Sequence, residues 1–223
     1  MQIHELILIF TSAFVALFPV VNPIGDGFII NGFLKDLDEE QRKIAAKKIF
    51  INCFMIGVGS LVIGHFVLLL FGLAIPAVQV GGGFIIIKTG MDMLTGNPSS
   101  YNKDNQKTID KITMEELEQK IFYPISFPIS VGPGSISVIF TLMASATVKG
   151  NLLHTGVNYL VIAAALFAIL IILYVFILRG RLMKKMGKSG SLIINKLIAF
   201  ITLCIGIQIM ARGISDMFHL SYM

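Results

Sequence analysis

Long apolar runs alternate with short charged stretches along the whole chain. The runs lie at residues 6–34, 49–71, 77–94, 122–146, 157–178 and 193–212. A helix needs about 20 apolar residues to cross the hydrocarbon core of a bilayer. Backbone polar groups in lipid must be satisfied within a helix or a closed barrel. Because the runs are longer than the roughly 10-residue strands of a barrel, the pattern predicts an all-α integral membrane protein with six transmembrane helices.

The composition agrees with a membrane protein and argues against a soluble enzyme. Only 14% of the residues are charged, whereas a soluble domain carries about 25%. The net charge of +5 does not indicate nucleic acid, because the positive side chains lie in loops between apolar runs. Cys53 and Cys204 lie inside such runs and are interpreted as packing residues. Residues 1–5 do not resemble the basic start of a cleavable signal peptide, so the first run is expected to remain in the protein.

Lysine and arginine are unevenly distributed between the loops. They concentrate after the first, third and fifth runs, whereas the opposite side offers only Lys149 and Arg212. Loops rich in Lys and Arg stay in the cytoplasm. We therefore expect a multi-pass inner-membrane protein with both termini outside.

The two halves of the chain resemble each other. Each half begins with a run that two prolines interrupt, at residues 18–25 (FPVVNPIG) and 127–134 (FPISVGPG). Glycines seven positions apart also recur in the third run and in the sixth: Gly83 and Gly90, Gly206 and Gly213. Because each half has three spans, an odd number, the second half would enter the membrane from the opposite side. This predicts a 3+3 inverted-topology repeat with broken first and fourth helices.

The repeat sets the expected organisation of the chain. We expect a single membrane domain over residues 1–223. Its first three-helix repeat covers residues 1–96, a cytoplasmic linker covers 97–121, and the second repeat covers 122–223.

The paired breaks are the candidate binding site. Proline removes a backbone donor and clashes with the preceding turn, so each break should unwind about one turn. The freed N–H groups of half-helix N-termini suit an anion such as a carboxylate, and the freed carbonyls suit a cation or an ammonium group. The candidate substrate-binding residues are Asn22, Pro23, Gly25, Asp26, Ser130, Gly132, Pro133, Gly134 and Ser135.

Two ionisable residues in the apolar runs are candidates for ion coupling. Asp26 follows the first break, and an ionisable group at membrane depth is by default a functional hypothesis. The alternative is that Asp26 caps a helix in an aqueous vestibule. His65 could relay a proton, or it could be a satisfied partner between helices.

The two motifs together resemble those of the MarC family, over the whole chain. They are Phe-Pro-Val-Val-Asn-Pro-Ile-Gly at residues 18–25 and Ser-Phe-Pro-Ile-Ser-Val-Gly-Pro-Gly-Ser at residues 126–135. The resemblance implies a bacterial or archaeal inner-membrane protein related to LysE-type exporters, with some members classed as neutral amino acid transporters. By motif it extends to Asn22, Pro23, Gly25, Gly132, Pro133 and Gly134. Asp26-Gly27 departs from the small polar and apolar run that often follows this motif, and an acid there could change the substrate or the coupling ion.

The leading functional hypothesis is a secondary transporter of a small neutral amino acid or similar metabolite, coupled to a proton or sodium gradient. An inorganic or metal ion transporter is the alternative, followed by a non-transporting membrane protein. An enzyme is not expected, because no nucleophile and base stand at helical spacing. We expect no cofactor and no resident metal. The expected partners are a small-molecule substrate, a coupling cation and membrane lipid, with a homo-oligomer left open and no nucleic acid.

Overall fold

The computed structural model describes residues 3–34, 37–95, 118–148, 150–179 and 187–218 of the 223-residue chain. In these ranges the chain forms helices and no strand, so the predicted all-α class is confirmed. The helices are α1 (Ile3–Val21), α2 (Pro23–Phe33), α3 (Glu39–Leu70), α4 (Ile75–Thr95), η1 (Ile121–Ser130), α6 (Pro133–Ala146), α7 (Leu152–Leu178) and α9 (Gly187–Phe218).

Four helical segments of the described chain are long and apolar enough to cross a membrane. They are residues Ile3–Phe33, Glu39–Gly64, Leu152–Leu178 and Asn195–Phe218, and the bent pair of η1 and α6 gives a fifth if it counts as one span. Helix α4 has 21 residues but is not among them, because glycines, Lys88 and Asp92 interrupt its apolar sequence. The structure therefore supports four to five spans of the six predicted.

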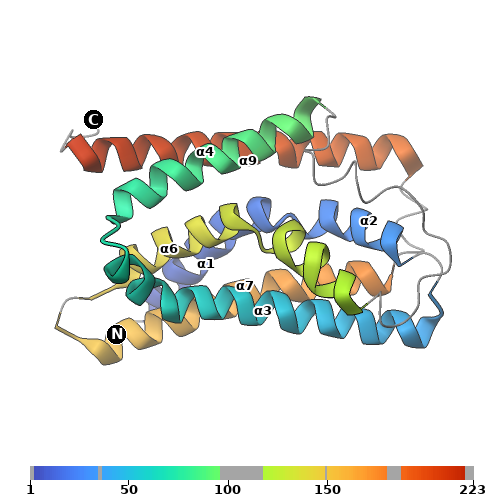
Figure 1. Cartoon of the computed structure of the whole chain (residues 1–223), viewed down its shortest axis with the longest axis horizontal. Coiled ribbons are helices and arrows are strands. Elements are labelled where there is room, and N and C mark those ends of the chain that lie inside the picture. The colour runs from blue at the N-terminus through green and yellow to red at the C-terminus, as the bar shows by residue number, and fades with distance from the viewer. Residues whose placement is uncertain (1–2, 35–36, 96–117, 149, 180–186, 219–223) are drawn as a thin grey trace.

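The helices form three layers (Figure 1). Helices α4 and α9 pack side by side along their length and form one layer, and α3 and α7 form the opposite one. The interrupted pairs α1–α2 and η1–α6 lie between these layers, since α1 contacts both α7 and α9 and α6 contacts both α3 and α4. The predicted broken helices are thus the interior of the molecule.

The helix ends gather at two opposite ends of the molecule. Helix α1 begins and α9 finishes at one end, whereas α2, α4 and α7 finish at the other (Figure 1). The start of α3, with its lysines and arginine, lies at this second end. The larger part of the predicted linker, and most basic residues of the second and third loops, lie outside the described residues.

Helix α3 begins earlier than the apolar pattern predicted. Residues 39–48 were expected to be a charged loop, but they form the first turns of α3. The Asp38 carboxylate accepts a hydrogen bond of 2.8 Å from the Gln41 N–H, and the Gln41 side chain accepts one of 3.3 Å from the Asp38 N–H. This reciprocal arrangement is a capping box, and Glu39 and Glu40 complement the helix dipole. Capping rather than hydrophobicity therefore sets the start of this helix.

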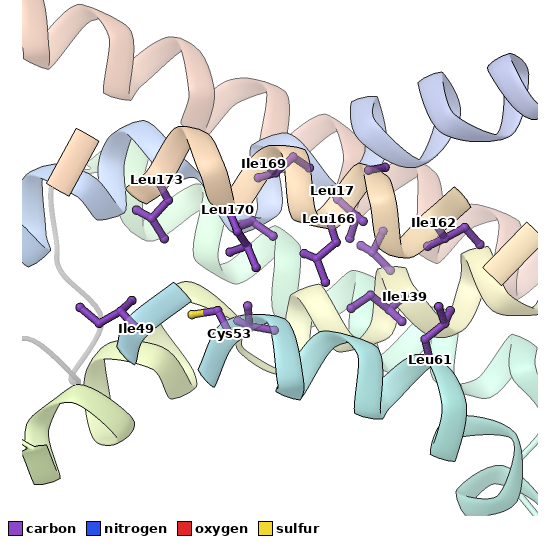
Figure 2. Close-up of a cluster of buried hydrophobic side chains, with 14 of the residues drawn as sticks. Leu17, Ile49, Cys53, Leu61, Ile139, Ile162, Leu166, Ile169, Leu170 and Leu173 are labelled. Carbon is purple, nitrogen blue, oxygen red and sulfur yellow. The ribbon is translucent and has the colours of Figure 1, made fainter. Parts of the chain in front are cut away.

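An apolar core joins α7 to α3 and to the interior helices (Figure 2). Leu166, Ile169, Leu170 and Leu173 of α7 are buried. They lie beside Leu17 of α1 and near the buried side chains of α3 that Figure 2 labels, which are Ile49, Cys53 and Leu61. Since lipid is as apolar as leucine, close packing rather than transfer from water stabilises such a core. This core packs α3 and α7 against each other and against the broken helices.

Helices α4 and α9 approach so closely that glycine is required at their contacts. A Cβ atom on Gly83 would lie 2.7 Å from the Met210 backbone nitrogen, and one on Gly206 would lie 2.7 Å from the Ile87 nitrogen. Gly83 and Gly206 are 123 positions apart in the sequence, and so are Ile87 and Met210. The two contacts are thus reciprocal, as a two-fold axis between antiparallel helices would make them.

The second glycine pair repeats this relationship. A Cβ atom on Gly90 would lie 2.7 Å from the Leu203 nitrogen, and one on Gly213 would lie 2.9 Å from the Val80 nitrogen. Gly90 and Gly213, like Val80 and Leu203, are again 123 positions apart. The two glycines of each half, which are seven residues apart, therefore belong to one interface between α4 and α9.

Candidate functional site

The first break is centred on Asn22, between α1 and α2. Asn22 adopts a left-handed backbone conformation (φ 47°, ψ 57°), and its side chain accepts a hydrogen bond of 3.1 Å from the Gly25 N–H. A Cβ atom on Gly25 would lie 2.1 Å from the Asn22 side chain. Asparagine tolerates this conformation better than most residues, and its side chain caps α2. The Asn-Pro-Ile-Gly motif thus builds a capped helix break.

The carbonyl that proline leaves unpaired at this break is satisfied from α9. In a continuous helix the Pro19 carbonyl would accept from residue 23, but Pro23 has no N–H. The Thr202 hydroxyl donates to the Pro19 oxygen at 3.0 Å, and Thr202 is buried. A residue of the second half therefore completes the first half's break.

The second break separates η1 from α6 with a bend of 57°. Tyr123 and Phe127 have extended backbone angles inside η1, and each precedes a proline, which disfavours the helical conformation of the residue before it. A Cβ atom on Gly132 would lie 2.4 Å from the Pro128 carbonyl oxygen. Only glycine fits at this turn.

Helix α6 begins without a side-chain cap. Gly132 stands at the N-cap position and supplies no side chain, and the Ile136 N–H donates to the Gly132 oxygen at 3.0 Å. The first N–H groups of a helix have no partner within it, and Pro133 lacks one. The N–H groups of Gly134 and Ser135 therefore have no hydrogen-bond partner within the described part of the chain, in contrast to the capped start of α2.

The two breaks lie close together in the interior. A Cβ atom on Gly134 would lie 3.1 Å from Ile86 of α4 and 3.6 Å from Val20 of α1. One turn further along α6, the Ser137 hydroxyl donates to the Val78 oxygen of α4 at 3.1 Å. The start of α6 thus packs between the last turn of α1 and the middle of α4.

Asp26 is buried one turn into α2, with 6% of its surface exposed. Its backbone N–H donates to the Asn22 oxygen at 2.9 Å, while its Oδ2 atom is buried with no hydrogen-bond partner among the described residues. A buried carboxylate without a partner is costly and marks a functional candidate. The structure thus favours the interpretation of Asp26 as a buried ionisable residue over that of a water-exposed helix cap.

The predicted site residues are mostly brought together. Asn22, Pro23, Gly25, Asp26, Ser130, Gly132, Gly134 and Ser135 are buried at or beside the two breaks, whereas Pro133 is exposed. Pro133 thus shapes the start of α6 without lining a closed site. His65 belongs to α3, but its side chain lies outside what the structure describes, so its coupling role stays a prediction.

Cys53 and Ser126 were not among the predicted site residues, but they lie in it. The Cys53 thiol of α3 lies 3.9 Å from the Ser126 carbonyl oxygen. The Ser126 hydroxyl donates to the Ile121 oxygen at 2.7 Å, within its own helix. The tandem sequence Tyr-Pro-Ile-Ser-Phe-Pro-Ile-Ser at residues 123–130 was the available signal that Ser126 accompanies Ser130.

Two further observations bear on the type of ligand. Within the described residues, no three His, Cys, Asp or Glu side chains group as a metal ion would require. A narrow apolar crevice with no room for a water molecule lies among Leu17, Gly57, Ile139 and Leu166, and no polar residue of the breaks lines it. The polar candidate site is therefore separate from this crevice.

Comparisons with known proteins agree with the motif resemblance. A UPF0056 membrane protein of Pyrococcus abyssi is 25% identical, over 96% of this chain and 98% of its own. The UPF0056 membrane protein YvbG of Bacillus subtilis is 28% identical over 92% and 93%, and the UPF0056 inner membrane protein MarC of Escherichia coli K12 is 25% identical over 91% and 92%. No solved structure matches. The family model described as MarC family integral membrane protein matches residues 7–218. The chain therefore belongs to the MarC family of integral membrane proteins.

Proposed function

We propose that this protein is a secondary transporter that moves a small neutral amino acid, or a similar small metabolite, across the inner membrane. A proton or sodium gradient would drive it. The observation that carries the proposal is the meeting of two broken helices in the interior, where the Asp26 Oδ2 atom is buried without a partner among the described residues and α6 begins without a side-chain cap. Broken helices that meet near the bilayer midplane are the usual substrate site of secondary transporters.

The reciprocal contacts of α4 and α9 support the six-span inverted repeat within this proposal. Equivalent glycines of the two halves contact equivalent residues of the opposite helix. The interior obeys the same relationship, because α1 packs on α7 and α9 as η1 and α6 pack on α3 and α4. In this proposal α4 is the remaining span, and its glycines are retained for close packing instead of lipid contact.

The chemistry of the two breaks favours a zwitterion. The free N–H groups of Gly134 and Ser135 suit a carboxylate, helped by the positive end of the α6 dipole. The Asp26 carboxyl suits a positive group. An amino acid carries an ammonium group and a carboxylate on the same carbon atom, so a small amino acid would use both.

Hydrogen bonds tie neighbouring helices together at both ends of the molecule, and in this proposal they would break and form in alternation during transport. At one end Arg42 donates to the Leu34 oxygen at 2.7 Å and to Asn31 Oδ1 at 2.6 Å, which ties α3 to the end of α2. At the other end Asn158 donates to the Ala146 oxygen at 2.9 Å, which ties α7 to the end of α6. Release of one tie at a time would give alternating access to the buried site.

Uptake by purified protein in liposomes tests the proposal. We expect labelled glycine or alanine to accumulate when a proton or sodium gradient is imposed. Gly132→Ala should abolish uptake, because the added Cβ meets the Pro128 oxygen, whereas Gly59→Ala, where no atom lies within 4 Å, should leave it intact. No uptake across a broad amino acid panel, with folded protein and both gradients, would refute amino acid transport.

A further inference from the structure

The layer of α4 and α9 packs on only one half of each broken helix. Helix α9 packs on α1 and α4 packs on α6, whereas in the described part of the chain neither makes more than isolated contacts with α2 or η1. Helices α1 and α6 are the halves nearer the end of the molecule where the chain begins (Figure 1). We infer that α4 and α9 move together as a rocking unit, and that this structure is the state in which the unit closes the site toward that end.

The uneven packing of the rocking unit departs from the relationship between the two halves of the chain. Helix α1 packs on α7 as η1 packs on α3, and α2 packs on α7 as α6 packs on α3. The same relationship would pair α4 on α6 with α9 on α2, and α9 on α1 with α4 on η1, but only the first contact of each pair is formed. The missing contacts define a second arrangement, in which the unit packs on α2 and η1. Rocking of one bundle against another is how inverted repeats give alternating access.

A reciprocal contact shows which residues of α2 and α6 are equivalent. A Cβ atom on Gly27 of α2 would lie 3.0 Å from the Cβ atom of Phe176 on α7, and one on Gly64 of α3 would lie 2.5 Å from Cε1 of Phe140 on α6. The second contact is the first with glycine and phenylalanine exchanged between the helices. Gly27 and Phe140, which are 113 positions apart, therefore hold equivalent places, and so do the residues that follow them.

Those following residues, Phe28 and Thr141, differ in burial as the packing of the rocking unit does. Thr141 lies one turn beyond Ser137, which contacts α4, and only 8% of its surface is exposed. Phe28 is only half-buried, although its side chain is the larger of the two. Helix α4 thus covers one half-helix, whereas α9 leaves the equivalent face of the other uncovered.

The contact between α4 and α6 is of a kind that can open. Its partners are small and polar, because Ser137 donates to the Val78 oxygen at 3.1 Å and a Cβ atom on Gly82 would collide with the Ser137 side chain. Gln79, which follows Val78, is buried, and its Oε1 atom has no hydrogen-bond partner among the described residues. Water would satisfy this atom if α4 moved away, so part of what packing contributes is offset while the contact is closed.

The inference rests on the proposed transport function and names its moving part. With the orientation that the loop charges predict, the closed end faces the outside, so the site is in its inward-facing state. The bond from Arg42 to the Leu34 oxygen holds the end of α2 to α3, in the layer opposite α9. Release of this bond would allow α2 to meet α9 as α4 leaves α6.

Two single cysteines report the state without a transport assay. In a Cys53→Ala, Cys204→Ala background, Thr141→Cys and Phe28→Cys are each reacted with MTSET, a charged, water-soluble methanethiosulfonate. Purified protein in detergent exposes both ends to the reagent, so the result does not depend on orientation. We expect Phe28→Cys to react at least about tenfold faster than Thr141→Cys, and equal rates would overturn the inferred state.

A wedge between α4 and α6 should reverse the two rates. In Gly82→Ala the added methyl group meets the Ser137 side chain, so we expect Thr141→Cys to react roughly tenfold faster and Phe28→Cys roughly tenfold more slowly. Gly81→Ala, where no atom lies within 4 Å, should change neither rate. Ser137→Ala removes only the hydrogen bond to Val78 and should shift both rates in the same directions by about fivefold.

A buried cysteine and an uptake assay complete the test. Ile169→Cys, fully buried on α7, should stay unreactive in each folded variant, and if it reacts in Gly82→Ala the comparison is made with Ser137→Ala. Faster labelling of Thr141→Cys without slower labelling of Phe28→Cys would overturn the rocking unit. Reversal of the rates without uptake in liposomes would retain the rocking unit and reject amino acid transport. Uptake with unchanged rates would do the opposite.

Discussion

The Thr202 hydroxyl on α9 donates a hydrogen bond of 3.0 Å to the carbonyl oxygen of Pro19 on α1. The two residues are 183 positions apart, and the bond replaces the one that Pro23 cannot make. The same hydroxyl lies 2.8 Å from the Ile198 oxygen of its own helix, so its single proton is shared between the two carbonyl oxygens. The last helix of the second half thus stabilises the interruption in the first helix of the chain.

Removal of this hydroxyl should destabilise the protein. In Thr202→Val the Pro19 carbonyl would remain buried without a donor, which costs about 1–3 kcal/mol. We expect a lower melting temperature in detergent. Thr89→Val is the matched control, because Thr89 is exposed and its hydroxyl bonds to the Ile85 oxygen of its own helix. Equal melting temperatures for the two variants would show that the bond to Pro19 is unimportant.

Substitutions of Asn22 should separate its two contributions to the first break. Asn22→Ala loses the cap on Gly25 and places alanine at φ 47°, and the two effects cost about 1–2 kcal/mol each. Asn22→Gly loses the cap but suits the left-handed conformation, so its unfolding free energy should lie between those of the wild type and Asn22→Ala. Guanidinium or heat unfolding monitored by circular dichroism measures this order. An alanine variant as stable as the glycine variant would contradict it.

Arg42 should matter far more than its neighbour Lys43. It donates to Asn31, Leu34 and Ile177 at the ends of two helices. Arg42→Ala should therefore cost about 1.5–3 kcal/mol for its charged hydrogen bonds. Lys43 is exposed, and Lys43→Ala should change stability by no more than about 0.5 kcal/mol. Thermal melts of both variants decide whether Arg42 is structural or simply part of the positive-inside signal.

The glycine interface of α4 and α9 predicts equal effects at equivalent positions. Gly83→Ala and Gly206→Ala each place a Cβ atom within 3 Å of the opposite backbone, and overpacking of this kind costs about 1–3 kcal/mol. Gly81→Ala, with no atom within 4 Å, should be neutral or slightly stabilising, because alanine favours helix. A strong difference in melting temperature between Gly83→Ala and Gly206→Ala would show that the two equivalent contacts do not contribute equally to stability.

The proposed orientation can be tested with single cysteines. In a Cys53→Ala, Cys204→Ala background, we expect cysteine at Leu153, which is exposed near the start of α7, to react in intact cells with a membrane-impermeant maleimide. Cysteine at Lys43, exposed at the opposite end of the molecule, should react only after the cells are opened. The reverse pattern would place both termini in the cytoplasm.

The sequence by itself determined the membrane class and the places where the helices break. Uninterrupted apolar length predicts helices in lipid, and Pro23 and Pro133 disrupt them by local chemistry, because a proline lacks its N–H wherever it stands. The capping box of residues 38–41 is also a local sequence signal, although the apolar pattern placed the start of α3 too late. The count of six spans and the direction of insertion remain predictions from hydropathy and charge.

Only the tertiary structure decided which groups satisfy those breaks and which do not. Neither the Thr202 bond to Pro19 nor the position of Cys53 against η1 has a local signature, because each depends on helices far apart in the chain. The same applies to the Asp26 Oδ2 atom, because its burial without a partner among the described residues follows from what the neighbouring helices present. Local sequence sets where backbone groups lose their partners, whereas the packing of distant helices sets whether those groups find new ones or stay available to a ligand.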